Sequence, residues 1–123
     1  MELVKPQPDH DVPRGVVGGS EVSAATTGAT GIYMGLFRLE PGARSRPHYH
    51  AQCESSCFMV SGEMVVSYGD GLEEQFSVRP GDMLFVPPHE THVLFNPHAT
   101  AAAEYVVARN AATEDSVEVP WAG

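Results

Sequence analysis

The sequence has few positive charges, no long apolar segment and little cysteine, and each shortage excludes a class of protein. Seven Lys and Arg residues stand against sixteen Asp and Glu residues, which gives a net charge of −9. Binding to nucleic acid or to an anionic membrane surface requires clustered cations, so we expect neither partner. No segment approaches the roughly 20 apolar residues of a membrane span, and residues 1–12 lack a signal-like apolar run. We therefore expect a cytoplasmic protein whose partner is a small molecule.

Cys53 and Cys57 are the two cysteines of the chain. If they lie on one strand, their Cα atoms are farther apart than a disulfide can span. A thiolate metal site would need further cysteines or a Cys-x-x-Cys pair, and the sequence has neither. We interpret both residues as reduced, small, buried side chains.

Signals for long helices are also missing. The 123 residues include 12 Gly and 10 Pro, and no stretch between them supports a helix of roughly three turns. Short β-type runs lie between these turns instead. We expect strands at 32–39, 46–50, 55–60, 63–68, 73–78, 83–86, 92–95 and 104–109. This length and pattern predict a single-domain, all-β protein, built as a closed or double-sheet jelly roll.

The chain divides into three parts in this interpretation. Residues 1–30 form an N-terminal arm that packs as an edge strand or contacts a partner subunit. Residues 31–110 form the β-barrel itself. Residues 111–123 form a C-terminal tail.

Five of the six histidines fall between positions 48 and 98. His48 and His50 flank Tyr49, and side chains two residues apart in a strand point to the same face. Taken alone, such a pair is more typical of packing or surface positions than of a ligand pair. Glu54 follows closely, however, and His92 begins another expected strand. Divalent Fe, Zn, Mn and Ni accept imidazole and carboxylate ligands, so we interpret these three histidines and the glutamate as candidate ligands of such an ion.

The spacing of these residues resembles the two motifs of the cupin family. The first motif runs from a glycine through His-x-His and a glutamate to a second glycine, and the second runs from a glycine through proline and histidine to asparagine. The matching residues are Gly42, His48, His50, Glu54 and Gly62 in the first motif, and Gly81, Pro87, His92 and Asn96 in the second. The resemblance covers residues 42–96. It implies a small cupin-type jelly-roll β-barrel that holds a metal ion and often forms a homodimer.

Two positions depart from the family pattern. Seven residues separate Glu54 from Gly62 where the family has six, so either the strand carries a bulge or Ser55 faces the metal instead. We favour Glu54, both as the fourth metal ligand and as the catalytic group that carries a proton. His89 stands where the family usually has glycine, which indicates either a strained backbone or a further imidazole in the substrate pocket.

Arg46, Phe85 and Leu94 complete the expected substrate site. Arg46 shares the strand parity of His48, which directs its guanidinium either to the mouth of the cavity or over the rim of the barrel. We expect Phe85 and Leu94, or their neighbours on the same strands, to supply an apolar wall, although packing alone would account for any of these residues. Such a pocket suits a small aromatic or oxygenated molecule better than a sugar phosphate.

Resemblance to the cupin family implies no single reaction. With Fe, Mn or Ni, the expected site favours dioxygenase-type cleavage of an enolisable carbonyl compound, which is the function we expect. With Zn, it favours isomerisation, dehydration or cyclisation of the polyketide-cyclase type, in which Glu54 would move the proton. A cupin that binds a small molecule without turning it over is the third alternative.

Overall fold

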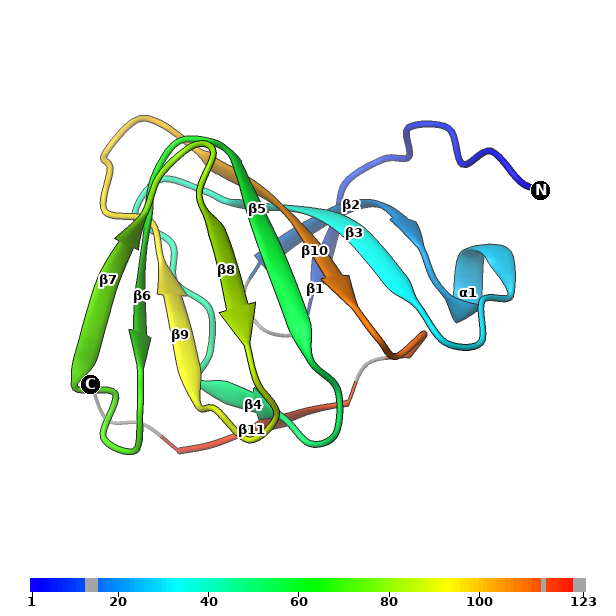
Figure 1. Ribbon diagram of the computed structural model, residues 1–123. Helices are drawn as coiled ribbons and strands as arrows, with labels where there is room; N and C mark the ends of the chain where they lie inside the picture. Colours follow the sequence, from blue (N-terminus) through cyan, green and yellow to red (C-terminus); the bar gives the residue numbers. More distant parts are fainter. Residues whose placement is uncertain (13–15, 114, 121–123) are drawn as a thin grey trace.

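The computed structural model describes residues 1–12, 16–113 and 115–120. Residues 13–15 of the expected arm, and 114 and 121–123 of the expected tail, lie outside the described residues. Within them the chain forms eleven strands and one short helix (Figure 1). In chain order these are β1 (His10–Val12), β2 (Val16–Val22), α1 (Ala24–Thr27), β3 (Tyr33–Leu39), β4 (His48–His50), β5 (Ser55–Ser61), β6 (Met64–Tyr68), β7 (Glu74–Val78), β8 (Met83–Val86), β9 (His92–Phe95), β10 (Ala103–Arg109) and β11 (Ser116–Glu118).

The strands form two antiparallel sheets. The larger sheet has the order β1-β2-β3-β10-β5-β8, and the smaller has the order β11-β4-β9-β6-β7. Figure 1 shows β3, β10, β5 and β8 side by side, with β9, β6 and β7 beyond them. All eight strands expected from the sequence form, each within two residues of its expected ends, so the all-β prediction is confirmed. In the part of the chain that the structure describes, no helix is long and apolar enough to cross a membrane.

Both ends of the chain add strands beyond the eight whose bounds the sequence pattern predicts. In the arm, β2 pairs with β3 and β1 pairs with β2, so residues 10–12 and 16–22 extend the larger sheet at its edge. In the tail, β11 pairs with β4. These strands are short or contain glycine, which weakens the period-two pattern that reveals a strand. The division into arm, barrel and tail stays a prediction.

Buried and exposed side chains alternate along the longer strands and thereby separate the core from the outer surface. In β5, Ser55, Cys57 and Met59 are buried, whereas the residues between them are exposed. β3 shows the same alternation. The apolar core between the sheets consists of Val16, Tyr33, Phe37, Leu39, Cys57, Met59, Met64, Val66, Val78, Ala103 and Tyr105. Parity within each strand therefore decides which side chains can reach an internal site.

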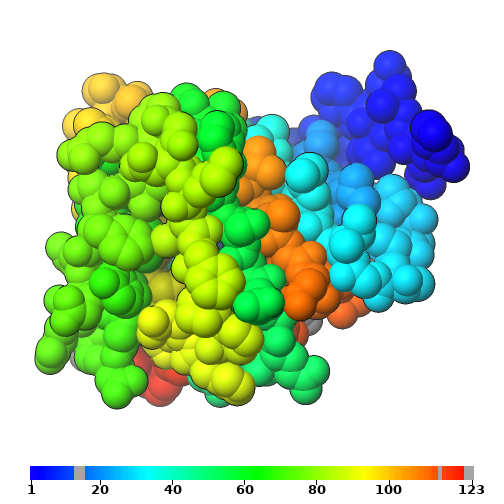
Figure 2. All heavy atoms as spheres, in the orientation of Figure 1, coloured from blue at the N-terminus to red at the C-terminus, as the bar shows by residue number. Residues whose placement is uncertain are grey.

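Apolar side chains also cover the outer surface of the larger sheet. Strand register aligns them in two rows, Leu36-Val106-Phe58-Met83 and Met34-Ala108-Ser56-Phe85. Met83 is 81% exposed and Phe85 is 61% exposed. Figure 2 views the molecule from this side, where β8, β5, β10 and β3 lie next to one another. Contiguous apolar surface is typical of an interaction site and not of an ordinary solvent-facing sheet.

The side chain of Asn96 joins the end of β3 to the loop between β9 and β10. It is fully buried, its Nδ2 donates to the carbonyl oxygens of Leu39 at 3.0 Å and Ala101 at 2.8 Å, and its Oδ1 accepts from the N–H of His98 at 3.0 Å. Buried backbone groups need hydrogen-bond partners, so this one amide stabilises both the end of β3 and the loop after β9.

We expect Asn96→Ala to lower the free energy of unfolding by about 2–4 kcal/mol, because the change removes three hydrogen bonds and leaves backbone groups without partners. Asn110→Ala is the matched control, since Asn110 is exposed and its Oδ1 accepts from the N–H of Glu54. Urea denaturation measures both variants. Equal losses of stability in the two would contradict the role assigned to Asn96.

Candidate metal centre

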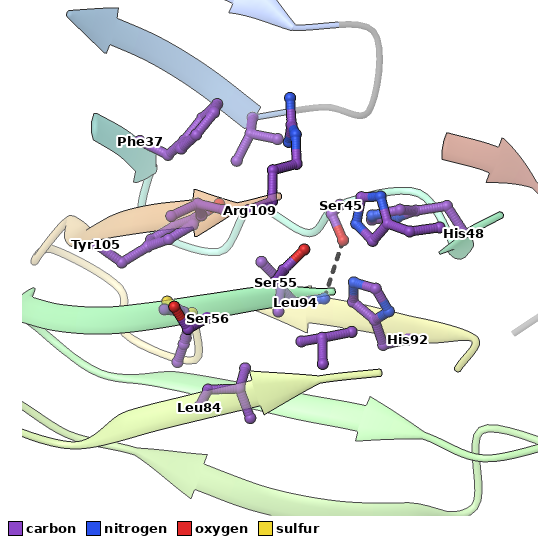
Figure 3. A pocket seen from close by; sticks show the side chains of 16 residues that line it. Phe37, Ser45, His48, Ser55, Ser56, Leu84, His92, Leu94, Tyr105 and Arg109 are labelled. Atoms are coloured by element: carbon purple, nitrogen blue, oxygen red, sulfur yellow. Dashed lines mark hydrogen bonds between the residues drawn. The ribbon is translucent and has the colours of Figure 1, made fainter. Parts of the chain in front are cut away.

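Three histidines from two neighbouring strands come together between the sheets. His48 of β4 and His92 of β9 are direct Cα partners, and His50 lies two residues along β4 on the same face. All three are buried, at 4–6% exposure. The ring centroids of His48 and His92 are 4.4 Å apart. The ring centroid of His50 lies 5.3 Å from that of His48 and 5.7 Å from that of His92. Figure 3 shows His48 and His92 directed toward the same space.

Hydrogen bonds determine which nitrogen of each ring carries the proton. Nδ1 of His48 lies 2.8 Å from the carbonyl oxygen of Arg46, and Nδ1 of His92 lies 2.8 Å from that of Glu90. A carbonyl oxygen only accepts, so in both rings Nδ1 is the donor and Nε2 carries the lone pair. Nδ1 of His50 faces a carboxylate oxygen instead, that of Asp115, at 3.2 Å. The protein thus orients all three rings through their Nδ1 atoms.

This arrangement can hold a metal ion. One ring nitrogen from each of the three histidines lies within 4.8 Å of the others. Imidazole nitrogens suit Zn, Fe and Ni, and bonding of the opposite ring nitrogen to the protein is typical of metal-ligating histidines. The donor set therefore fits a divalent transition metal without choosing among Fe, Zn, Mn and Ni.

Glu54 does not join these histidines, and the expectation that it is the fourth ligand is corrected. Its side chain is exposed, whereas that of Ser55 is buried beside the histidines. The strand does carry a bulge, but the bulge lies at the other end of β5, where Ser61 and Met59 pair with consecutive residues of β10. Alternation from Met59 back to Ser55 therefore turns Ser55 inward and Glu54 outward. Glu54 does not line the cavity in which its expected role as a proton carrier would place it.

A cavity of about 60 Å³ adjoins the histidines. Leu94 lines it, as expected, but Phe85 points to the outer surface, and its neighbours Leu84 and Val86 line the cavity in its place. The Oγ of Ser55 is buried in this wall and has no hydrogen-bond partner among the residues that the structure describes. Among the described residues no carboxylate lines the cavity. Figure 3 shows the arrangement, with Ser55 and Leu94 near His92.

Arg46 and His89 also lie away from the cavity. The Arg46 side chain is 64% exposed and forms an ion pair with Glu118 at 3.5 Å, which is the rim position and not the mouth. His89 is exposed, with its ring 5.9 Å from that of Tyr49. Its φ is +65°, in the left-handed region that favours glycine. The backbone explanation for His89 therefore holds, and the expectation of a further imidazole in the pocket is wrong.

Sequence reasoning missed Arg109, which brings a guanidinium to the cavity wall. Arg109 is the last residue of β10, is 8% exposed, and stacks over the ring of Tyr33 at 3.8 Å. Strand alternation could have predicted this position, because Arg109 lies on the same inward face of β10 as Ala103 and Tyr105.

The two cysteines are buried and make no disulfide, as predicted. Burial raises the pKa of the Cys57 thiol to about 12. Burial and the hydrogen bond to Asp115 raise the pKa of the Cys53 thiol to about 11. Both thiols are therefore protonated at neutral pH, and Cys57 contributes to the cavity as a small apolar group.

Comparison with known families and sequences places the chain among related proteins. The model of the cupin domain family matches residues 35–108, more than half of the chain. The chain is 35% identical over 71 residues to the protein called polyketide synthase CurC from Streptomyces cyaneus. That match covers 58% of this chain and 44% of CurC, so this chain corresponds to less than half of that relative.

Similar solved structures share the fold. Recombinant oxalate oxidase in complex with glycolate matches with a TM-score of 0.72 and 27% identity, over 89% of this chain and 57% of that one. The polyketide cyclase RemF from Streptomyces resistomycificus matches with a TM-score of 0.76 and 18% identity, over 97% of this chain and 82% of that one. Both likenesses support the expected jelly roll.

Proposed function

The chain belongs to the cupin family, and from this premise we propose that it is a metal-dependent enzyme with dioxygenase-type chemistry on a small enolisable carbonyl compound. One observation carries the proposal: three buried, oriented histidines adjoin a cavity that no described carboxylate lines. His48, His50 and His92 would hold the ion through their Nε2 atoms.

The ligand set favours an anionic oxygen ligand. Three imidazoles are neutral, so a divalent ion held by them would keep its full charge, would favour an enolate over a neutral ligand, and would supply the redox chemistry of the reaction. The chain itself contributes Ser55, whose buried hydroxyl can donate to a substrate oxygen. Leu84, Val86 and Leu94 exclude water from the same space.

The size of the cavity favours a small substrate. A water molecule needs about 10–15 Å³ of such space, so 60 Å³ accommodates a ligand of only a few non-hydrogen atoms unless side chains move. A short diketone or enediol fits this limit better than a polycyclic aromatic compound does.

The proposed reaction balances without a further reductant. One carbon–carbon bond between a carbonyl carbon and the central carbon of the diketone breaks, and each of the two carbons receives one atom of dioxygen. The substrate supplies all the electrons, and the products are a carboxylic acid and a dicarbonyl compound. The chain's part is to orient the enolate and keep water away from it.

A Zn-dependent cyclase, isomerase or dehydratase is the second candidate. The similarity to CurC, whose name refers to polyketide synthesis, supports it. A second cavity of about 490 Å³ shares Phe37 and Arg109 with the first, and could accommodate a larger substrate if the two joined. The exposed position of Glu54 weighs against this route, because it removes the carboxylate that would move the proton.

Removal of one ligand tests the metal site. We expect the protein purified without added metal to hold a nearly stoichiometric transition metal, and His92→Ala to hold at least tenfold less, because a ligand is lost. His98→Ala is the matched control, since His98 is exposed and pairs with Glu63. Elemental analysis measures all three proteins. Full occupancy in His92→Ala, or no uptake by the unaltered protein, would contradict the site.

Oxygen dependence separates the candidate reactions. We expect a panel of short diketones and enediols to include a substrate that consumes one dioxygen per molecule cleaved, measured with an oxygen electrode and product analysis. Under argon, cleavage should stop. Turnover that continues without dioxygen would instead support the Zn-dependent candidate, and ligand affinity that survives complete metal removal would support a cupin that only binds.

The outer apolar face is where we propose that a second copy of the chain binds to form a homodimer. Its two rows of side chains are uncharged and cross four strands, so burial against the same face of another copy would remove them from water. We expect sedimentation to show a dimer that Phe85→Glu converts to a monomer. Phe76→Glu, at a 39% exposed position of the other sheet, should leave the dimer intact. A monomeric unaltered protein would refute this interface.

A further inference from the structure

The carboxylate of Asp115 accepts from four hydrogen-bond donors, one in the last residue of β4 and three in the segment that follows it. Its Oδ2 accepts from the backbone N–H groups of Gln52 at 2.8 Å and Cys53 at 3.1 Å. Its Oδ1 accepts from the Cys53 thiol at 3.1 Å and lies 3.2 Å from Nδ1 of His50. The backbone carbonyl of Asp115 also accepts from the N–H of Ala51, at 3.3 Å. The residue just before β11 is thus bound at several points to the strand that carries two of the three histidines.

These contacts determine the direction of the hydrogen bond to His50. The carboxylate already accepts from the backbone N–H groups of Gln52 and Cys53 and from the Cys53 thiol. An aspartate carboxylate is ionised at neutral pH and can only accept. Nδ1 of His50 must donate, which leaves the lone pair on Nε2.

We propose that Asp115 is a positioning residue that holds His50 in the orientation and tautomer needed for metal binding. This inference rests on the metal site proposed above. In His48 and His92, Nδ1 donates to a backbone carbonyl oxygen, which any side chain at the acceptor position would provide. His50 depends on a side chain 65 residues away. The strand that follows Asp115 pairs with β4, Ser116 opposite His50, and so fixes the carboxylate beside its target.

The same atoms could instead form a second metal site, because ligand atoms of His50, Cys53 and Asp115 lie within 4.8 Å of one another. The observed contacts favour the positioning role. The S–H group of Cys53 donates a hydrogen bond to Asp115 and keeps its proton. Burial also favours the neutral thiol over the thiolate that metals bind. A second site would also compete with His48 and His92 for the same imidazole.

The first experiment examines the tautomer directly and needs no variant. Long-range ¹H–¹⁵N spectra of the metal-free, full-length protein at about pH 8, above the reference pKa of free histidine, report which nitrogen of His50 carries the proton. We expect protonated Nδ1 and unprotonated Nε2. A protonated Nε2, or a mixture of the two tautomers, would overturn the inference even if the metal site itself were confirmed.

The second experiment measures the effect on metal binding. We expect Asp115→Asn to weaken Co(II) and Zn(II) affinity about 10- to 100-fold and to change the Co(II) absorption spectrum, because a neutral amide orients the ring less firmly. Asp115→Glu should restore part of the affinity. Glu118→Gln is the matched control, since Glu118 lies on β11 but contacts the exposed Arg46.

The outcomes distinguish this inference from the metal site on which it rests. If the unaltered protein binds no metal, the proposed function fails, and the tautomer of His50 still decides the role of Asp115. If Asp115→Asn binds metal as tightly as Glu118→Gln and with an unchanged spectrum, the positioning role is wrong. Binding of two ions by the unaltered protein and of one by Cys53→Ala would establish a second site instead and overturn the inference. Circular dichroism verifies that each variant is folded.

Discussion

The site depends on the pairing of β4 with its two neighbours. β4 is three residues long and contributes both His48 and His50, so it has little pairing of its own to hold it in place. On one side His48 lies opposite His92 of β9, and on the other β11 pairs along the whole strand. Because side chains alternate across a strand, this one register directs the two histidines of β4 inward together. If the pairing register of β4 slipped by one residue, Tyr49 would face inward and both histidines would face outward.

The backbone before β4 strengthens the same register. Ser45 donates its N–H to the carbonyl of Leu94 at 2.8 Å, and its hydroxyl accepts from the N–H of Leu94 at 2.9 Å. These bonds connect the approach to β4 directly to the middle of β9. The second motif is joined to the first in the same way at His89, whose N–H donates to the carbonyl of His50 at 2.8 Å. Strand pairing, loop contacts and imidazole orientation therefore support a single geometry.

Much of this structure follows from local pattern, and the rest requires contacts that no local pattern encodes. Gly and Pro spacing predicts eight strands, and the His-x-His spacing predicts that His48 and His50 share a face. Glu54 is misplaced because the bulge near Ser61 absorbs the additional residue far from it, and sequence spacing alone does not locate a bulge. Asp115 was assigned to a tail because its partners lie more than 60 residues earlier.

The central claim is that three imidazoles, without Glu54, form the metal site. A crystal structure of the metal-loaded protein, with anomalous scattering to identify the ion, tests it most directly. The account predicts one ion about 2.0–2.2 Å from Nε2 of His48, His50 and His92, with Glu54 still on the outer surface. An ion bound by the Glu54 carboxylate, or located away from these histidines, would contradict it.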